Sequence, residues 1–300
     1  MAELILHHYD TSPFSEKVRA MLGVKGLAWR SVIQPVIMPK PELVPLTGGY
    51  RRIPVMQAGA DVYCDSQVIL EEIERRHPEP KVIRGADWAV NLFCDRTWFQ
   101  ASVAIIFARL GDAVPRAFIE DREKLSGRPF DVKAMQAAAP FARDQWRAYA
   151  AWADAALADA PFLGGERPSL ADVATWMPIW WAAGADAALL NGLDNLSGWA
   201  ERMRSFGHGQ RTEMSPADAL AAARAAEPEG YDGTSLSEGP APGQAVRVSA
   251  DDYGRDPIRG RLVHAGGRRI VIAREDPDLG RLNIHLPRAG YVLAADDQGA

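Results

Sequence analysis

The sequence predicts three units in chain order: an α/β unit, an all-α helical unit and a small all-β, barrel-like unit. Strand and helix patterns alternate over the first part of the chain. Long alanine- and tryptophan-rich segments with helical spacing follow, and short alternating runs between turns come last. At 300 residues the chain is long enough for two or three folding units, each with a sizeable core.

The α/β unit occupies residues 1–80, in the order βαβ followed by ββα. Thr11-Ser12-Pro13 predicts the start of the first helix, because a proline fits the first helical turn. Gly59 separates two short runs and predicts a hairpin. This order is typical of a thioredoxin-like fold. The predicted strands are residues 4–9, 29–36, 54–57 and 61–64, and the second helix begins at Ser66.

The helical unit occupies residues 86–227, where helical spacing continues without strand patterns. Residues 228–243 are rich in Gly, Pro, Ser and Glu, a composition typical of a linker, and residues 244–296 form the barrel-like module. A linker here predicts that few contacts cross the boundary, so a chain without residues 243–300 is expected to keep a folded core. The predicted helices are residues 87–111, 131–160, 169–190, 194–206 and 216–226, and the predicted strands of the module are residues 244–248, 259–265, 268–274, 281–286 and 291–294.

Composition and charge exclude several classes of function. The formal net charge is -5 and basic residues are interspersed with acidic ones, which predicts no nucleic-acid surface. No window approaches about 18 uninterrupted apolar residues, and Met1-Ala2-Glu3 does not begin a signal peptide, so we expect a cytoplasmic protein without a membrane anchor. Cys64 and Cys94 are too few for a thiolate metal site. His7 and His8 point to opposite faces of a strand and cannot easily share an ion, so no metal is predicted.

The junction of the first strand and first helix carries the sequence Tyr9-Asp10-Thr11-Ser12-Pro13-Phe14-Ser15. In thioredoxin-like redox proteins this junction carries Cys-x-x-Cys, whereas here Ser12 and Ser15 occupy both sulfur positions, so dithiol exchange is excluded. A hydroxyl at a helix N-terminus can still donate a hydrogen bond to a bound thiolate, and the helix dipole favours the same anion. Ser12 also suits a purely structural N-cap.

Two further motifs follow at the positions that a thioredoxin-like ligand site requires. Ile53-Pro54 opens a strand, and the fold places a cis-proline there, which turns the backbone of Ile53 toward an extended peptide ligand. Asp65-Ser66 lies at the start of the next helix, whose N–H groups favour a carboxylate. In the helical unit, Ser169 and Asp172 form a capping box, a structural feature that predicts no catalytic role.

Taken in order, these motifs resemble those of the glutathione S-transferase family, over roughly residues 3–210. The Ser-Pro-Phe segment is similar to that of the serine-type, tau- and theta-like classes. The resemblance implies that Ser12 activates the thiol of glutathione, with Tyr9 as the alternative donor. It further implies that Asp65 and Ser66 hold the γ-glutamyl group. The family places a basic residue upstream for the glycine carboxylate, and Lys40 matches it by spacing.

The resemblance implies an enzyme that conjugates the thiolate of glutathione to a small apolar electrophile, with no metal. It also implies a homodimer, because family members usually pair the first domain of one subunit with the helical domain of the other. The alternative is a non-catalytic scaffold of the same family that presents its C-terminal module to a protein partner.

Overall fold

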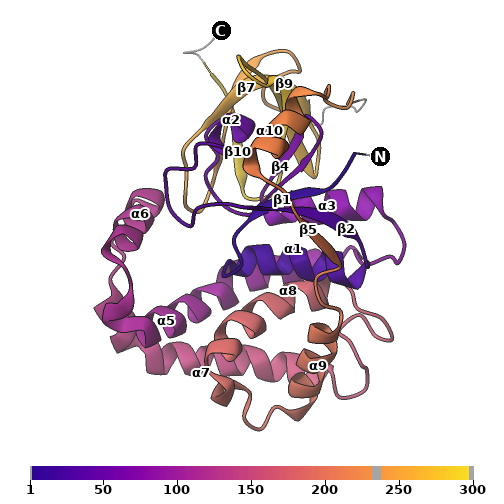
Figure 1. Cartoon of the computed structure of the whole chain (residues 1–300). Coiled ribbons are helices and arrows are strands. Elements are labelled where there is room, and N and C mark those ends of the chain that lie inside the picture. Colours follow the sequence, from indigo (N-terminus) through magenta and orange to yellow (C-terminus); the bar gives the residue numbers. More distant parts are fainter. Residues whose placement is uncertain (1, 232–237, 297–300) are drawn as a thin grey trace.

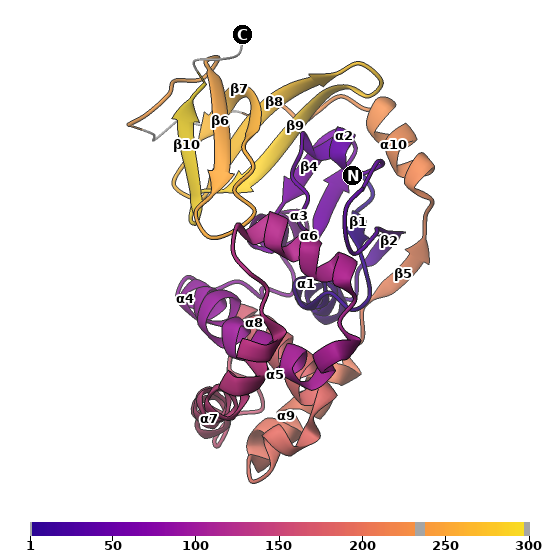
Figure 2. The same cartoon turned by 90° about the vertical axis from the view of Figure 1, so that its left-hand side faces the viewer.

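The computed structural model describes residues 2–231 and 238–296, so part of the predicted linker lies outside the described residues. Two views at right angles show the helical part at one end, the strand-rich C-terminal module at the other, and the thioredoxin-like part between them (Figures 1 and 2). The three predicted kinds of structure are confirmed in this order.

The thioredoxin-like part is a mixed sheet with α1 and α3 packed beside each other. β1 pairs in parallel with β2 and antiparallel with β3, which forms a hairpin with β4. All four residues of β1, β3 and β4 are buried, because helices and other strands cover the sheet on both faces. The bounds are β1 Ile5–His8, α1 Pro13–Val24, β2 Ala28–Ile33, α2 Val44–Thr47, β3 Val55–Ala58, β4 Asp61–Cys64 and α3 Ser66–Arg76.

The helical part has its own core, in which Trp146 and Trp199 are fully buried. The predicted helix at 87–111 contains a π-helical turn between two α-helices, and α6 lies outside the segments predicted from sequence. Gly127, with a φ of 67°, ends α6 and is the sequence signal that could have revealed it. The bounds are α4 Asp87–Phe93, η1 Cys94–Trp98, α5 Phe99–Leu110, η2 Gly111–Ala113, α6 Arg116–Ser126, α7 Val132–Ala156, α8 Leu170–Pro178, η3 Ile179–Ala183, η4 Ala187–Leu190 and α9 Asp194–Ser205.

Ser169 and Asp172 form the capping box at the start of α8. The Ser169 hydroxyl oxygen accepts a hydrogen bond from the N–H of Ala171 at 3.1 Å, and the Ser169 N–H donates to Asp172 Oδ2 at 2.8 Å. The indole of Trp199 donates to the other oxygen of Asp172 at 2.9 Å. Asp172 is fully buried and its oxygens are used by the fold, which fits a structural role.

After α9 the chain returns to the thioredoxin-like sheet. β5 (Gln210–Glu213), which the sequence patterns did not predict, pairs in parallel with β2, and α10 (Pro216–Arg224) follows. The buried Ala219 of α10 packs against Ile5 and Val32. The segment therefore extends one edge of the sheet and covers part of one face.

The C-terminal module consists of five strands, close to the predicted bounds, that extend the opposite edge of the sheet. β9 pairs in parallel with β4, with Tyr63 opposite His285, so one ten-stranded sheet runs in the order β10-β6-β7-β8-β9-β4-β3-β1-β2-β5. The bounds are β6 Ala245–Ala250, β7 Ile258–Ala265, β8 Arg269–Asp276, β9 Gly280–Pro287 and β10 Tyr291–Ala295.

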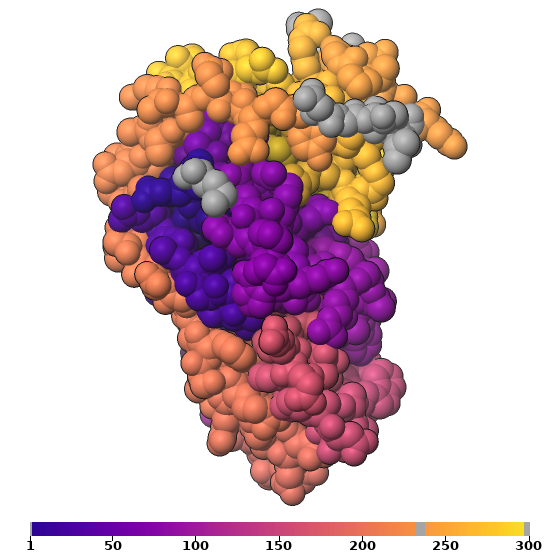
Figure 3. All heavy atoms as spheres, turned by 90° about the vertical axis from the view of Figure 1, so that its right-hand side faces the viewer, coloured from indigo at the N-terminus to yellow at the C-terminus, as the bar shows by residue number. Residues whose placement is uncertain are grey.

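The expectation that few contacts cross the boundary before the module is wrong. Val55 and Val62 of the thioredoxin-like part share one hydrophobic cluster with Val248, Ile272 and Ile284 of the module. The space-filling view shows the module, orange to yellow, lying directly on the purple surface of the thioredoxin-like part (Figure 3). Composition predicted a linker, but it could not show that the strands beyond it pair with β4.

Candidate functional site

The loop between β1 and α1 brings together Ser12 and Tyr9, the two hydroxyls predicted near a thiolate. Ser12 caps α1: its Oγ accepts a hydrogen bond from the N–H of Ser15 at 3.2 Å, and its own N–H donates to the Tyr9 carbonyl oxygen at 3.1 Å. The Tyr9 hydroxyl interacts with the Ser12 side chain. Burial raises the pKa of Tyr9, so its hydroxyl stays protonated at neutral pH. Ser12 is only 2% exposed, so neighbouring side chains cover most of it.

Arg19 holds the loop between β1 and α1 through hydrogen bonds to its backbone and to both flanking elements. Its guanidinium donates to the carbonyl oxygen of Asp10 at 2.8 Å and to Glu16 at 2.8 Å, and it lies 3.0 Å from Nδ1 of His8. Because arginine only donates, Nδ1 of His8 is the unprotonated acceptor. Burial, together with the charge of Arg19, lowers the pKa of His8 to about 3. His7 is buried as well and bonds Gln57 at 3.1 Å. Both histidines therefore belong to the core.

The Ile53–Pro54 peptide bond is cis and precedes β3. Lys40 is buried, and its ammonium donates to the carbonyl oxygen of Arg51 at 3.0 Å, two residues before Ile53. Burial lowers the pKa of Lys40 to about 8. Lys40 therefore lies beside the segment that the resemblance assigns to peptide binding.

Asp65 and Ser66 lie at the N-terminus of α3. Oδ1 of Asp65 accepts a hydrogen bond from the N–H of Gln67 at 2.9 Å, so Asp65 is the cap, and Ser66 is buried. Asp65 has a φ of 98°, a backbone conformation that residues with a side chain rarely adopt. Oδ2 of Asp65 accepts a hydrogen bond from the hydroxyl of Tyr291 at 3.0 Å. The C-terminal module thus reaches the predicted site.

Helix α6 also borders this site. Asp121 on α6 accepts hydrogen bonds from the N–H of Met38 at 3.1 Å and from the Arg51 guanidinium at 2.5 Å. The carbonyl oxygen of Leu125 accepts from the N–H of Gly254 in the module at 2.7 Å. Figure 2 shows α6 in this bridging position, between the helical part and the module. Residues of all three units therefore lie around the predicted site.

Arg52 lies at the centre of the contacts with the module. Its guanidinium faces the rings of Tyr50, Tyr253 and Tyr291, with centroids at 5.1, 5.3 and 5.6 Å, and it pairs with Asp252 at 3.2 Å. Two of these tyrosines come from the module. No sequence signal links them to Arg52, because about two hundred residues separate them.

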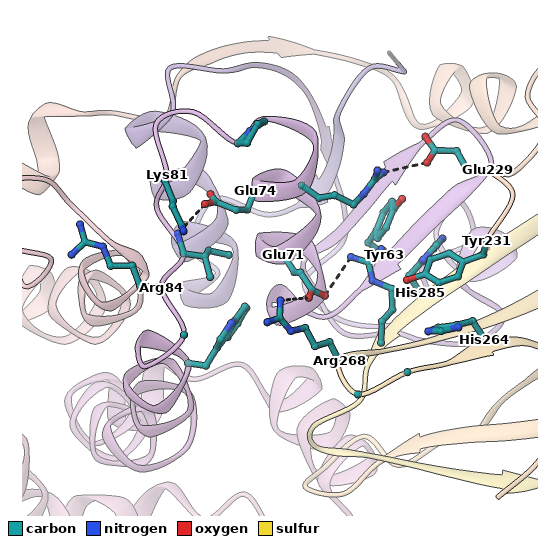
Figure 4. Close-up of a pocket in the computed structure, with 18 of the residues that line it drawn as sticks. Tyr63, Glu71, Glu74, Lys81, Arg84, Glu229, Tyr231, His264, Arg268 and His285 are labelled. Atoms are coloured by element: carbon teal, nitrogen blue, oxygen red, sulfur yellow. Dashed lines mark hydrogen bonds and ion pairs between the residues drawn. The ribbon is translucent and has the colours of Figure 1, made fainter. Parts of the chain in front are cut away.

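A large cavity of about 1190 Å³ lies elsewhere, between α3, residues 78–88 and the module (Figure 4). The stacked rings of Tyr63 and His285 lie on one side of it, with centroids 4.3 Å apart, and Nε2 of His285 lies 2.7 Å from Asp61. Its charged side chains are largely paired with each other, as Arg269 is with Glu71 at 3.4 Å. Neither Ser12 nor Asp65 lines this cavity, so its size alone does not make it the thiol site.

The described residues contain no group of three or more His, Cys, Asp or Glu side chains that could hold a metal ion. Across the ranges that the structure describes, no helix is both long and apolar enough to span a bilayer.

Two family models match the chain: the glutathione S-transferase N-terminal domain at residues 6–81 and the C-terminal domain of the same family at residues 107–202. A search of curated proteins returned no match. Among solved structures, a GST-like protein from Pseudomonas syringae is 31% identical, with a TM-score of 0.81, and the match covers 99% of this chain and 100% of that one.

Two further solved structures match the fold without the full length. A glutathione S-transferase from Rhodospirillum rubrum F11 is 17% identical, with a TM-score of 0.55, and the match covers 67% of this chain and 88% of that one. One from Methylobacterium radiotolerans, in complex with glutathione sulfonate, is 20% identical, with a TM-score of 0.50 and coverage of 71% and 97%. The Pseudomonas syringae protein thus matches the module as well, whereas these two cover about two thirds of the chain.

The family models match both predicted units in the predicted order, and a relative is similar over the full length. The chain therefore belongs to the glutathione S-transferase family, with a strand-rich C-terminal module in addition to the two domains of that family.

Proposed function

We propose that this protein binds glutathione between Ser12 and Asp65 and transfers its thiolate to a small apolar electrophile. The observation that carries the proposal is the position of Ser12, whose hydroxyl caps the N-terminus of α1. The Ser12 oxygen accepts from the N–H of Ser15, which leaves its proton available for donation to a sulfur. Negative charge is favoured at this helix N-terminus.

Ionisation of the thiol is the step that Ser12 would assist. A free thiol with a pKa of about 8.5 is only a few per cent ionised at pH 7, and lowering it by roughly two units makes the thiolate dominant. A hydrogen bond to a charged group is worth about 1.5–3 kcal/mol, and one pKa unit corresponds to about 1.4 kcal/mol. One hydroxyl and a helix N-terminus therefore supply energy of the required size.

The remaining predicted residues would hold the rest of the tripeptide. The backbone of Ile53 would pair with the cysteinyl part, and Lys40, with a pKa of about 8, would carry a positive charge for the glycine carboxylate at neutral pH. Ser66 and the N–H groups of α3 would hold the γ-glutamyl carboxylate, while Asp65 would pair with its ammonium. The glutathione sulfonate complex of the Methylobacterium radiotolerans enzyme supports a ligand of this kind.

We also propose a cytoplasmic homodimer, as the family resemblance implies. Leu92, Phe141 and Trp152 of the helical part are 47%, 69% and 64% exposed, and a subunit interface would remove such apolar surface from water. Light scattering that finds only a 32.7 kDa species at micromolar concentration would argue against the dimer.

The proposed function is tested by replacing Ser12 and Tyr9 in turn. Ser12→Ala should raise the pKa of bound glutathione by roughly one to two units and lower conjugation at neutral pH about ten- to a hundredfold, because the donor to the thiolate is lost. Tyr9→Phe should do far less. Thiolate absorbance of bound glutathione against pH measures both.

Ser12→Ala also removes a helix cap, and the chain offers a matched control. Ser215 caps α10, is followed by Pro216, and accepts from the N–H of Asp218 at 3.1 Å, as Ser12 does from Ser15. Ser215→Ala should cost similar stability without changing the thiolate titration. A shifted titration in Tyr9→Phe alone would transfer the role to Tyr9. If the unchanged protein neither bound glutathione nor turned it over, that result would favour the non-catalytic scaffold.

A further inference from the structure

We infer that Tyr291, in the C-terminal module, is a positioning residue of the glutathione site: it orients the carboxylate of Asp65 toward the ammonium of the γ-glutamyl group. This inference rests on the proposed function, and it assigns to the module a part in recognising the ligand. Tyr291 acts through Asp65.

The sheet explains how Tyr291 reaches Asp65. β4 and β9 are parallel neighbours, with Tyr63 opposite His285, so their carboxyl ends lie at the same edge. Asp65 directly follows β4, and Tyr291 follows β9 after the short connection 288–290. Pairing of the module with β4 thus brings the two residues together across 226 positions of sequence.

Asp65 is held at both oxygens. Oδ1 is occupied by the N–H of Gln67 and Oδ2 by the hydroxyl of Tyr291. The φ of 98° at Asp65 is unfavourable for a residue with a side chain, and such conformations persist only where the surroundings enforce them. A carboxylate accepts about four hydrogen bonds, so the described contacts leave capacity for an ammonium.

The direction of the hydrogen bonds follows from Arg52 and Asp65 together. The Arg52 guanidinium can only donate, and it donates to the Tyr291 oxygen, whereas the Asp65 carboxylate accepts, so the Tyr291 hydroxyl donates to Asp65. Burial raises the pKa of Tyr291 well above its usual range, which keeps that proton in place. Arg52 itself lies 3.6 Å from Asp65 and 3.2 Å from Asp252. Because Asp252 offsets its charge, Asp65 remains attractive to a second cation.

The test compares two ligands: glutathione, and the same tripeptide without its α-amino group. Calorimetry measures their affinities for the full-length protein, and the ratio of the two isolates recognition of the ammonium. Tyr291→Phe should lower this ratio about three- to tenfold, the expected effect of one oriented hydrogen bond. Asp65→Asn should lower it at least as far, and Tyr291→Phe should add little in the Asp65→Asn background, because both act on one contact.

Tyr253→Phe is the matched control, since its ring also faces Arg52, and it should leave the ratio unchanged. Arg52→Lys keeps the positive charge beside Asp65 but loses the fixed guanidinium donor to Tyr291, and it should lower the ratio in the same direction, which keeps the test usable if Tyr291→Phe does not fold. Equal weakening of both ligands, or no change, in Tyr291→Phe overturns the positioning role. Failure of the unchanged protein to bind either ligand overturns the proposed function and this inference with it.

Discussion

The N-termini of α1 and α3 both face the proposed glutathione site, but they are built in different ways. Ser12 caps α1 through Ser15, three residues away, and every partner of that cap is local. Asp65 caps α3 through Gln67, but its second oxygen is held by Tyr291, 226 residues further along the chain. In the proposed site, the thiol end would therefore be encoded locally, whereas the γ-glutamyl end would depend on the C-terminal module.

The two helix N-termini also differ in the role proposed for them: ionisation of the thiol at α1 and recognition of the γ-glutamyl group at α3. Ionising a thiol needs one donor and a helix N-terminus, and both come from a single loop and helix. Recognising a charged amino-acid group needs several oriented partners, and in the proposed site these would come from the N-terminus of α3, the segment around Arg52 and β10. Changes in the module are therefore expected to alter affinity and selectivity before they alter thiol ionisation.

The largest expected effect comes from removing the module. Deletion of residues 243–300 should abolish cooperative folding, because β4 loses its partner β9 and a shared hydrophobic cluster loses one side. Each buried Val, Ile or Leu side chain left uncovered costs about 2 kcal/mol, so a few suffice to exceed a typical stability of about 5–15 kcal/mol. Circular dichroism during thermal unfolding measures this, with a chain ending at Asp296 as control. A deletion variant that unfolds cooperatively at the original temperature would refute it.

The second prediction concerns acid and the loop that carries Ser12. Burial lowers the pKa of His7 to about 4 and that of His8 to about 3, below the value of 6.5 of an exposed histidine. Both histidines are neutral in the folded and unfolded chain above pH 6.5, so the free energy of unfolding is highest there. As the pH falls from 6.5 toward 4, the unfolded chain binds protons that the folded one does not, and the free energy of unfolding decreases by about 1.4 kcal/mol per pH unit for each histidine. Urea unfolding at pH 7 and pH 5 measures the loss.

His8→Gln supplies the comparison for the acid experiment. It removes one of several histidines whose pKa is lowered by burial, with His7 and His285 among those that remain, so the decrease in stability between pH 7 and pH 5 should be smaller than that of the unchanged protein by about 2 kcal/mol. An identical decrease in both proteins would show that His8 does not titrate in this range, and that Arg19 holds the loop independently of it.

The smallest effect is expected from Lys40 at alkaline pH. Its pKa of about 8 means that the ammonium loses its proton as the pH rises through 8, so affinity for the glycine carboxylate should fall severalfold. S-methylglutathione is the suitable ligand, because it has no titrating thiol. Lys40→Arg should keep only the part of the decrease that comes from the ammonium of the ligand itself, and Lys81→Arg on the surface should retain the full decrease. An affinity independent of pH in the unchanged protein would remove Lys40 from the site.

Local patterns predicted most of the elements in their order, although not α6 or β5, and they predicted helix caps, because these depend on neighbouring residues. Ser12-Pro13 starts α1 and Ser169 with Asp172 starts α8, since a cap bonds only to N–H groups a few residues away. The alternating runs of the last sixty residues predicted five strands for the same reason.

Only the tertiary structure decided which strands pair and which side chains meet at the site. Strand pairing brings together residues far apart in sequence, and period-two alternation shows that a strand has partners without naming them. The sequence therefore could not show that β9 pairs with β4, nor that Tyr291 reaches Asp65. The sequence predicted the two helix starts at the proposed site, near Ser12 and Asp65. The long-range pairing of β9 with β4 then brought Tyr291 to Asp65.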